Sequence, residues 1–173
     1  MAHLHCSNDL LKQLGAAPAQ TEALPLSAPG RLGDWCVSMI PLGKRNAALF
    51  MNQATQLSFI ILEGQRFDVQ AMAQIFWGGL SSVLALHGVQ SNVAEAVVDS
   101  YAELVLAKTP NASLTAQMSS LARDYKQLVA AAGSIERCDV GAVIQSLNQR
   151  PRKGLNFATP QEAVFEFLKA AAA

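Results

Sequence analysis

The apolar residues in the first half of the chain occur in short runs that end at turn-forming residues, a pattern that predicts β-strands. Strands are expected at residues 3–6, 34–42, 47–51 and 57–62. The second and third strands flank a Gly-Lys-Arg-Asn turn at residues 43–46, so they form a hairpin. Ser7 can cap a short helix that ends at Gly15. Residues 16–30, rich in proline and small side chains, predict a surface loop.

The second half of the chain changes to the spacing of helices, with bulky apolar residues three or four positions apart. Helices are predicted at residues 69–86, from Asn111 or Ser113 to Gly133, at residues 139–147, and from Thr159 onward. Thr159 and Glu162 have the spacing of a capping box, with proline at the first helical position. Asn92 and Glu95 also resemble a capping box, but residues 97–107 are equally compatible with a strand.

These elements predict an α+β fold in which a small, mostly antiparallel sheet from the N-terminal half packs against helices from the C-terminal half. We expect a single domain over residues 1–173, since the length suits one core. Residues 148–158, which contain the Arg-Pro-Arg-Lys-Gly break, form a basic connection to the C-terminal helix.

The helix predicted at residues 69–86 contains no charged residue and approaches the length of a membrane span. Glutamine and serine side chains and the Gly78-Gly79 pair lower its hydrophobicity, so a buried helix is favoured over a transmembrane one. The glycine pair predicts close approach of another backbone or side chain to this helix. We therefore expect both faces of the helix to be covered.

The composition narrows the classes of partner. Half of the residues are hydrophobic (51%) and only 15% are charged, which favours self-association or another protein interface. The net charge of zero removes the long-range field that a general nucleic-acid or anionic-membrane binder carries, so neither is favoured as a partner. Three widely spaced cysteines without a CxxC pair suit a reducing compartment, and we expect a cytoplasmic protein.

Several short motifs, in the same order, resemble an uncharacterised bacterial family of domains of unknown function related to plasmid ORF-3-like proteins. They are His5-Cys6-Ser7, Leu32-Gly33-Asp34-Trp35, Lys44-Arg45 with Leu49-Phe50-Met51-Asn52, Lys108-Thr109, and the closing Leu147-Asn148 and Thr159-Pro160-Gln161-Glu162. The resemblance spans most of the chain and supports the fold and the cytoplasmic location, but it carries no activity. In such proteins the helix at residues 69–86 usually has charges on one face, which are absent here.

A second resemblance is confined to the end of the chain. Residues 147–155 and 159–162 are similar to the tail of some insertion-sequence transposases with an acidic catalytic triad. No such triad precedes this tail on a matching strand pattern, so transposition is not expected. A basic turn followed by a capped helix explains the likeness equally well.

Five basic residues are the candidate contacts for a partner or a phosphate, because guanidinium groups bind carboxylates and phosphates. They are Lys44, Arg45, Arg150, Arg152 and Lys153. Aromatic residues for base stacking are lacking around both groups, so an acidic protein is favoured over nucleic acid. Asp34 and Trp35 are the candidates for a pocket beside the hairpin, although a core tryptophan next to a turn aspartate is the simpler interpretation.

Metal and catalytic sites are not predicted. His3, His5 and Cys6 have suitable ligand types, but only His87 and Cys36 are available as distant additions, so ordinary terminal-strand residues are the preferred interpretation. Cys138 lacks a nearby histidine that could act as a base. No catalytic residue and no cofactor are assigned.

The leading hypothesis is therefore a non-enzymatic protein-interaction module that associates with itself or with another protein. One alternative is a nucleic-acid-associated accessory protein of mobile-element origin that uses the basic turns. Another is a small enzyme with an unidentified substrate and a pocket near Asp34 and Trp35.

Overall fold

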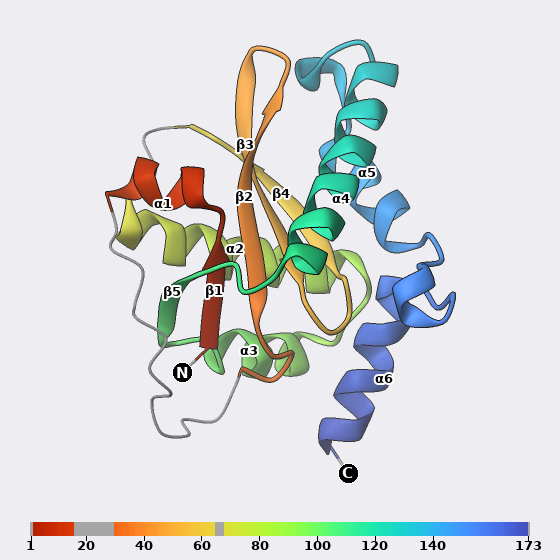
Figure 1. Cartoon of the computed structure of the whole chain (residues 1–173). Helices are drawn as coiled ribbons and strands as arrows, with labels where there is room; N and C mark the ends of the chain where they lie inside the picture. The colour runs from red at the N-terminus through yellow and green to blue at the C-terminus, as the bar shows by residue number, and fades with distance from the viewer. Residues whose placement is uncertain (1, 16–29, 65–67, 173) are drawn as a thin grey trace.

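A computed structural model describes residues 2–15, 30–64 and 68–172. The loop predicted at residues 16–30 lies outside this part of the chain except for Gly30. Within the described residues, five strands form one sheet and helices pack against it (Figure 1). The α+β class expected from the sequence is confirmed.

The five strands of the sheet are β1 (Ala2–Cys6), β2 (Trp35–Leu42), β3 (Arg45–Asn52), β4 (Ser58–Leu62) and β5 (Leu104–Lys108), in the order β4-β3-β2-β1-β5. The predicted hairpin is formed by β2 and β3, and β4 adds to it in antiparallel fashion. β1 is parallel to both of its neighbours, β2 and β5. The sheet is therefore mixed, and the long connection between β4 and β5 brings a strand from the second half of the chain to its edge.

The helices are α1 (Asn8–Leu14), α2 (Val69–Leu86), α3 (Ser91–Asp99), α4 (Ala112–Ala131), α5 (Val140–Asn148) and α6 (Pro160–Ala172). Ser7 and Asn111 cap α1 and α4 with their side chains, as predicted. The capping box at Thr159 and Glu162 is confirmed by two reciprocal hydrogen bonds of 2.8 and 3.1 Å. The Asn92–Glu95 box was wrong: α3 starts at Ser91, and its cap residue makes no side-chain hydrogen bond.

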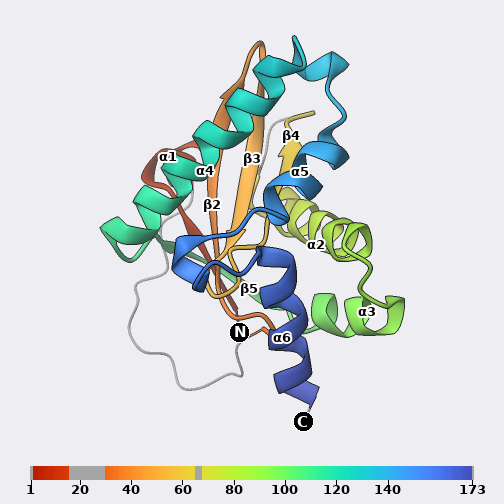
Figure 2. The same cartoon turned by 90° about the vertical axis from the view of Figure 1, so that its right-hand side faces the viewer.

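The helices cover the two faces of the sheet unequally. α2 and α3 lie behind the sheet in Figure 1, whereas α4 lies to the right of β2 in that view and contacts it. After a rotation of 90° (Figure 2), α4 and α1 stand on one side of the strands and α2 and α3 on the other. α5 closes the side of the sheet at β4.

Aromatic rings fill the space between the sheet and α2. The Trp35 and Phe76 rings meet edge to face at a centroid distance of 5.4 Å, and the Phe50 and Phe59 rings stack at 4.8 Å. All four side chains are essentially fully buried. Offset and edge-to-face pairs of this kind stabilise a core beyond the area that they bury.

The Asn148 side chain pairs with the backbone of Ser58 at the free edge of β4. The Asn148 amide accepts a hydrogen bond from the Ser58 backbone N–H (2.9 Å) and donates one to the Ser58 carbonyl (2.8 Å), as a neighbouring strand would. Its second N–H lies 3.2 Å from His87 Nε2. Burial lowers the pKa of His87, so its ring is neutral near pH 7 and can accept this hydrogen bond. Asn148 therefore attaches α5 to both β4 and the end of α2.

α2 is only partly enclosed. By length and composition alone it could cross a membrane, but Met72, Phe76 and Leu80 are fully buried against the sheet, as in the core helix of a globular domain. The opposite side is exposed to solvent. We call it the outer face of α2; it consists of Val69, Gln70, Gln74, Gly78, Ser81, Ser82, Ala85 and Leu86. The described residues of this chain leave the second face uncovered, so the expectation that both faces are covered stays a prediction that requires another molecule.

The two adjacent glycines of α2 offer a matched test of this packing. A Cβ atom at Gly79 would overlap the Phe59 ring, whereas one at Gly78 meets nothing within 4 Å. We expect Gly79→Ala to destabilise the fold by about 1–3 kcal/mol through overpacking. Gly78→Ala should stabilise it by about 1 kcal/mol through helix propensity. Urea unfolding of the two variants measures both changes, and equal effects would contradict the packing of Phe59 on Gly79.

Candidate functional site

Two histidines lie on the same face of β1. Residues alternate along the strand, so Ala2, Leu4 and Cys6 enter the core and are fully buried, while His3 and His5 project from the opposite face. Cys6 therefore cannot join the histidines as a ligand, contrary to the combination considered from the sequence. Only the pairing of His3 with His5 persists.

Asp34 joins the histidines because β1 and β2 are parallel. Leu4 is paired with Trp35 in the sheet, so the residue before Trp35 lies beside His3. The His3 backbone N–H donates a hydrogen bond of 3.0 Å to Asp34 Oδ1. The backbone carbonyl of Asp34 accepts from the Gln53 N–H at 3.0 Å. The Asp34 carboxylate is thus held by β1, and its backbone carbonyl is held by Gln53, the residue that follows β3.

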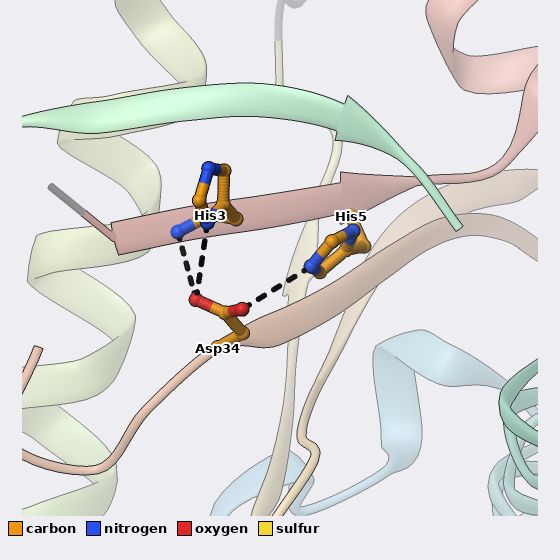
Figure 3. A group of neighbouring side chains, drawn as sticks. All are labelled: His3, His5 and Asp34. Atoms are coloured by element: carbon orange, nitrogen blue, oxygen red, sulfur yellow. Dashed lines mark hydrogen bonds and ion pairs between the residues drawn. The ribbon is translucent and has the colours of Figure 1, made fainter. Parts of the chain in front are cut away.

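The three side chains converge, as Figure 3 shows. His5 Nε2 lies 3.4 Å from Asp34 Oδ2, and His3 Nδ1 lies 3.6 Å from Asp34 Oδ1. One ligand atom from each residue fits within a group whose members are at most 4.8 Å apart. We call this group the His–Asp cluster. His5 is buried, whereas 36% of the His3 side chain and 33% of the Asp34 side chain are exposed to solvent. One side of the cluster is therefore open.

The protonation of His5 is constrained by its partners. Its Nδ1 lies 3.1 Å from the Lys108 carbonyl, which only accepts hydrogen bonds, so Nδ1 carries a proton. Nε2 then faces a carboxylate, and this contact is attractive only if Nε2 also holds a proton or if a cation lies between the two atoms. Metal-binding histidines commonly donate their second N–H to a backbone carbonyl in this way.

The pKa values of the metal-free cluster reflect an ion pair. Burial lowers the pKa of His5, but the hydrogen bonds to Asp34 and the Lys108 carbonyl and the charge of Asp34 outweigh it, so the net shift is upward. Burial raises the pKa of Asp34, but hydrogen bonds from His5 and His3 and their charges lower it below its usual value. Each shift favours the charged form of its group.

The separations within the cluster suit a transition-metal ion. Two ligands that bind a tetrahedral Zn²⁺ at about 2.0–2.1 Å lie about 3.4 Å from each other. The separations from His5 Nε2 to Asp34 Oδ2 (3.4 Å) and from His3 Nδ1 to Asp34 Oδ1 (3.6 Å) are close to this value, and each histidine faces a different oxygen of the carboxylate. Two imidazoles and one carboxylate are also a common donor set for Zn²⁺ and Fe²⁺.

Asp34 and Trp35, the candidates for a pocket beside the hairpin, do not face a common space. Trp35 is fully buried, and its indole N–H donates to the Tyr101 hydroxyl at 3.1 Å. Consecutive residues at the start of a strand point to opposite faces, so Asp34 lies in the His–Asp cluster and Trp35 in the core. The simpler interpretation of Trp35 as a core residue is confirmed.

The remaining residues considered as ligands are distant or unsuitable. His87 is engaged in the buried network of Asn148. Burial raises the pKa of Cys6 to about 12 and that of Cys36 to about 11, so both thiols stay protonated. Burial also raises the pKa of Cys138.

The two basic groups are not brought together. Lys44 and Arg45 are exposed at the tip of the β2–β3 hairpin, and residues 150–153 lie near α6 toward the other end of the molecule (Figures 1 and 2). The Arg45 guanidinium donates to the Glu63 carbonyl at 3.1 Å. Arg150 and Lys153 are exposed, but Arg152 points inward.

Arg152 joins α4 to the end of α5. Its guanidinium lies 3.5 Å from the Asp124 carboxylate and donates to the Leu147 carbonyl at 3.2 Å. Only 19% of its side-chain surface is exposed to solvent. This arginine therefore has a structural role within the chain, in addition to the contact role predicted for it.

The comparisons with known proteins point to a family without an assigned activity. The family model described as a domain of unknown function (DUF6933) matches residues 3–163. This match includes every residue of the His–Asp cluster. No curated protein matches the chain.

The inward position of Arg152 leads to a stability prediction. Arg152→Met removes the pair with Asp124 and the hydrogen bond to Leu147, and we expect it to cost about 1–2 kcal/mol of unfolding free energy. Arg150→Met, an exposed neighbour of the same type, should change stability by less than about 0.5 kcal/mol. Denaturant unfolding compares the two, and equal losses would contradict the structural role of Arg152.

Proposed function

We propose that this chain, which belongs to the family described as a domain of unknown function (DUF6933), binds a divalent transition-metal ion through His3, His5 and Asp34. The observation that carries the proposal is the contact between His5 Nε2 and Asp34 Oδ2 at 3.4 Å, while Nδ1 is committed to the Lys108 carbonyl. A metal ion between these atoms accepts one lone pair from His5 Nε2 and one from Asp34 Oδ2. It takes the place of the proton that otherwise holds the pair together.

The donor set favours a borderline ion such as Zn²⁺, Co²⁺ or Fe²⁺. Three protein ligands leave at least one coordination position for water or another small ligand, which distinguishes this arrangement from a closed structural site. The exposed sides of His3 and Asp34 give that position access to solvent. The proposal departs from the expectation of no metal, which paired His3 and His5 with Cys6 and did not include Asp34.

Metal binding can be measured with Zn²⁺ and Co²⁺. We expect one equivalent of Zn²⁺ to bind by calorimetry, and Co²⁺ to give the intense visible absorption of a tetrahedral site. His5→Ala and Asp34→Asn should each weaken Zn²⁺ binding by at least about tenfold, because each removes a ligand. Asp99→Asn changes an exposed carboxylate on α3 and should leave the affinity unchanged.

Two results would refute metal binding at this site. One is the absence of Zn²⁺ uptake by the folded wild-type protein. The other is undiminished uptake by the His3→Ala/His5→Ala double variant. Circular dichroism of each variant shows whether it is folded, so a loss of binding is not confused with a loss of structure.

A second candidate function is self-association, the leading hypothesis from the sequence. It is favoured by the outer face of α2, which is exposed, carries no charged residue, and ends in Val69 and Leu86 with 47% and 37% of their surfaces accessible. A second copy of the same face is a suitable partner because neither copy would bury a charge. The separate positions of the basic groups do not favour nucleic acid. The proposed relation to plasmid ORF-3-like proteins and the cytoplasmic location rest on sequence patterns.

A charge on the outer face of α2 tests self-association. Gln74→Glu should raise the dimer dissociation constant at least about tenfold, because a symmetric interface would bury two like charges. Gln127→Glu, an exposed glutamine on α4, is the matched control and should have no effect. Sedimentation equilibrium measures both variants. A wild-type protein that is monomeric at tens of micromolar would end this proposal.

A further inference from the structure

The side-chain amide of Asn148 has only one possible orientation. Its two partners at Ser58 are backbone groups, an N–H that can only donate and a carbonyl that can only accept, so the oxygen and the nitrogen of the amide cannot be exchanged. The amide nitrogen therefore presents its second N–H to His87 Nε2 at 3.2 Å. Asn148 is fully buried and His87 is only 6% exposed, so the contact is shielded from bulk solvent.

This contact determines the protonation of His87. Because Asn148 donates, Nε2 must accept, and the single proton of the neutral ring is then on Nδ1. Nδ1 is buried and has no hydrogen-bond partner of suitable geometry among the described residues, although the Gln161 side chain lies nearby. A second proton on the ring would place two donors 3.2 Å apart in the core. The contact between α2 and α5 thus requires the neutral ring.

The surroundings of His87 offer no charge that would compensate for a second proton. α2, α5 and β4 contain no charged residue. The carboxylates of α4 and α6 are engaged elsewhere: Asp124 with Arg152, Glu162 with the Thr159 N–H, and Glu166 with Lys169. Burial raises the pKa of Tyr125, which contacts Ser58, so its hydroxyl stays neutral. Burial lowers the pKa of His87, and the Gln161 side chain offsets only part of this effect.

The apolar packing around this contact is incomplete. A cleft of about 200 Å³ lies between the three elements that Asn148 joins. Its walls are apolar and include Ile60 of β4, Leu86 of α2 and Ile144 of α5. Because the cleft interrupts the packing of α5 on its neighbours, the attachment of α5 depends more strongly on the hydrogen bonds of Asn148.

We propose that His87 is an acid-sensitive latch for α5: a second proton on its ring removes the acceptor of Asn148 and releases α5 from the end of α2 and from the edge of β4. The released edge carries the N–H and carbonyl groups of Ser58 and, by the alternation along a strand, those of Ile60. The apolar walls of the cleft become exposed at the same time. Acidification therefore opens a surface at β4 that is closed at neutral pH.

The direction of the pH dependence follows from the neutral ring. The closed form binds one proton fewer than the open form, in which the pKa of the histidine has its ordinary value of about 6.5. The latch is therefore fully stable above about pH 6.5 and weakens as the pH falls toward the lower pKa of the closed form. One proton changes the equilibrium between the two forms by at most about tenfold for each pH unit, so we expect a change on the order of tenfold between pH 7 and pH 5.

Amide hydrogen exchange measured by NMR tests the latch in the full-length protein. The Ser58 N–H reports the latch, because it donates to Asn148. The next N–H, that of Phe59, points to β3 and reports the sheet itself. We expect the protection of Ser58 relative to Phe59, corrected for the pH dependence of exchange in unfolded chains, to fall about tenfold from pH 7 to pH 5. The nitrogen chemical shifts of His87 should show a proton on Nδ1 at pH 7.

Two variants remove the titration of His87. His87→Gln retains an acceptor for Asn148 and should keep Ser58 protected at both pH values. His87→Phe has no acceptor and should lower the protection of Ser58 equally at both. His5 and Asp34 are unchanged in both variants, so their titration does not contribute to the difference from the wild-type protein.

Three results would overturn the latch. One is a proton on Nε2 of His87 at pH 7. Another is an equal loss of protection at Ser58 and Phe59 in the wild-type protein, which would mean that acid acts on the whole fold. The third is a pH-dependent ratio of Ser58 to Phe59 protection that persists in His87→Gln. Circular dichroism shows whether the variants fold, and the wild-type protein with His87→Gln decides the question if His87→Phe does not.

Discussion

The Tyr101 hydroxyl holds the turn that positions Asp34. It accepts hydrogen bonds from the Leu32 backbone N–H (3.2 Å) and the Trp35 indole (3.1 Å), and it donates to the Gly33 carbonyl (2.7 Å). The hydroxyl thus donates one hydrogen bond and accepts two, so none of its hydrogen-bonding positions is left unpaired in the buried core. Gly30 has no side chain because a Cβ there would overlap the Tyr101 ring. The carboxylate of Asp34 is consequently placed by a residue from the second half of the chain, and the geometry of the cluster depends on the closed fold.

The parallel position of β1 between β2 and β5 links this turn to the rest of the site. It sets Asp34 beside His3 and brings the Lys108 carbonyl to His5 from the other side. The same strand turns Leu4 and Cys6 toward the aromatic core, so one five-residue element contributes to both stability and the cluster. At the far edge of the sheet, Asn148 replaces a missing strand partner with its side-chain amide. A side chain thus pairs with the start of β4 at one edge of the sheet, while the His–Asp cluster lies on β1 near the other edge.

The sequence was sufficient for the elements that are determined locally. Ser7, Asn111 and Thr159 lie next to the helices that they cap, so short-range hydrogen bonds define those boundaries. The site depended on pairing at long range, which has no local signal: the parallel register of β1 and β2 excludes Cys6 and includes Asp34. Alternation along β1 could have separated Cys6 from the histidines, but only the register identifies Asp34 as the residue that lies beside them. The pairing of Arg152 with Asp124 also has no local signal, because the sequence does not distinguish a basic residue that points inward from its exposed neighbours.

The two ring nitrogens of His5 determine which charges the His–Asp cluster can hold. Its Nδ1–H is fixed by a carbonyl, so the space between Nε2 and the Asp34 carboxylate must hold positive charge, either a proton or a metal ion. A metal ion held there would displace the proton, so metal binding would be coupled to proton release. A divalent ion opposite a single carboxylate would leave excess positive charge at the cluster. An anionic ligand at the open coordination position would offset this charge, which is the physical reason to expect a bound metal ion to favour an anion at the cluster.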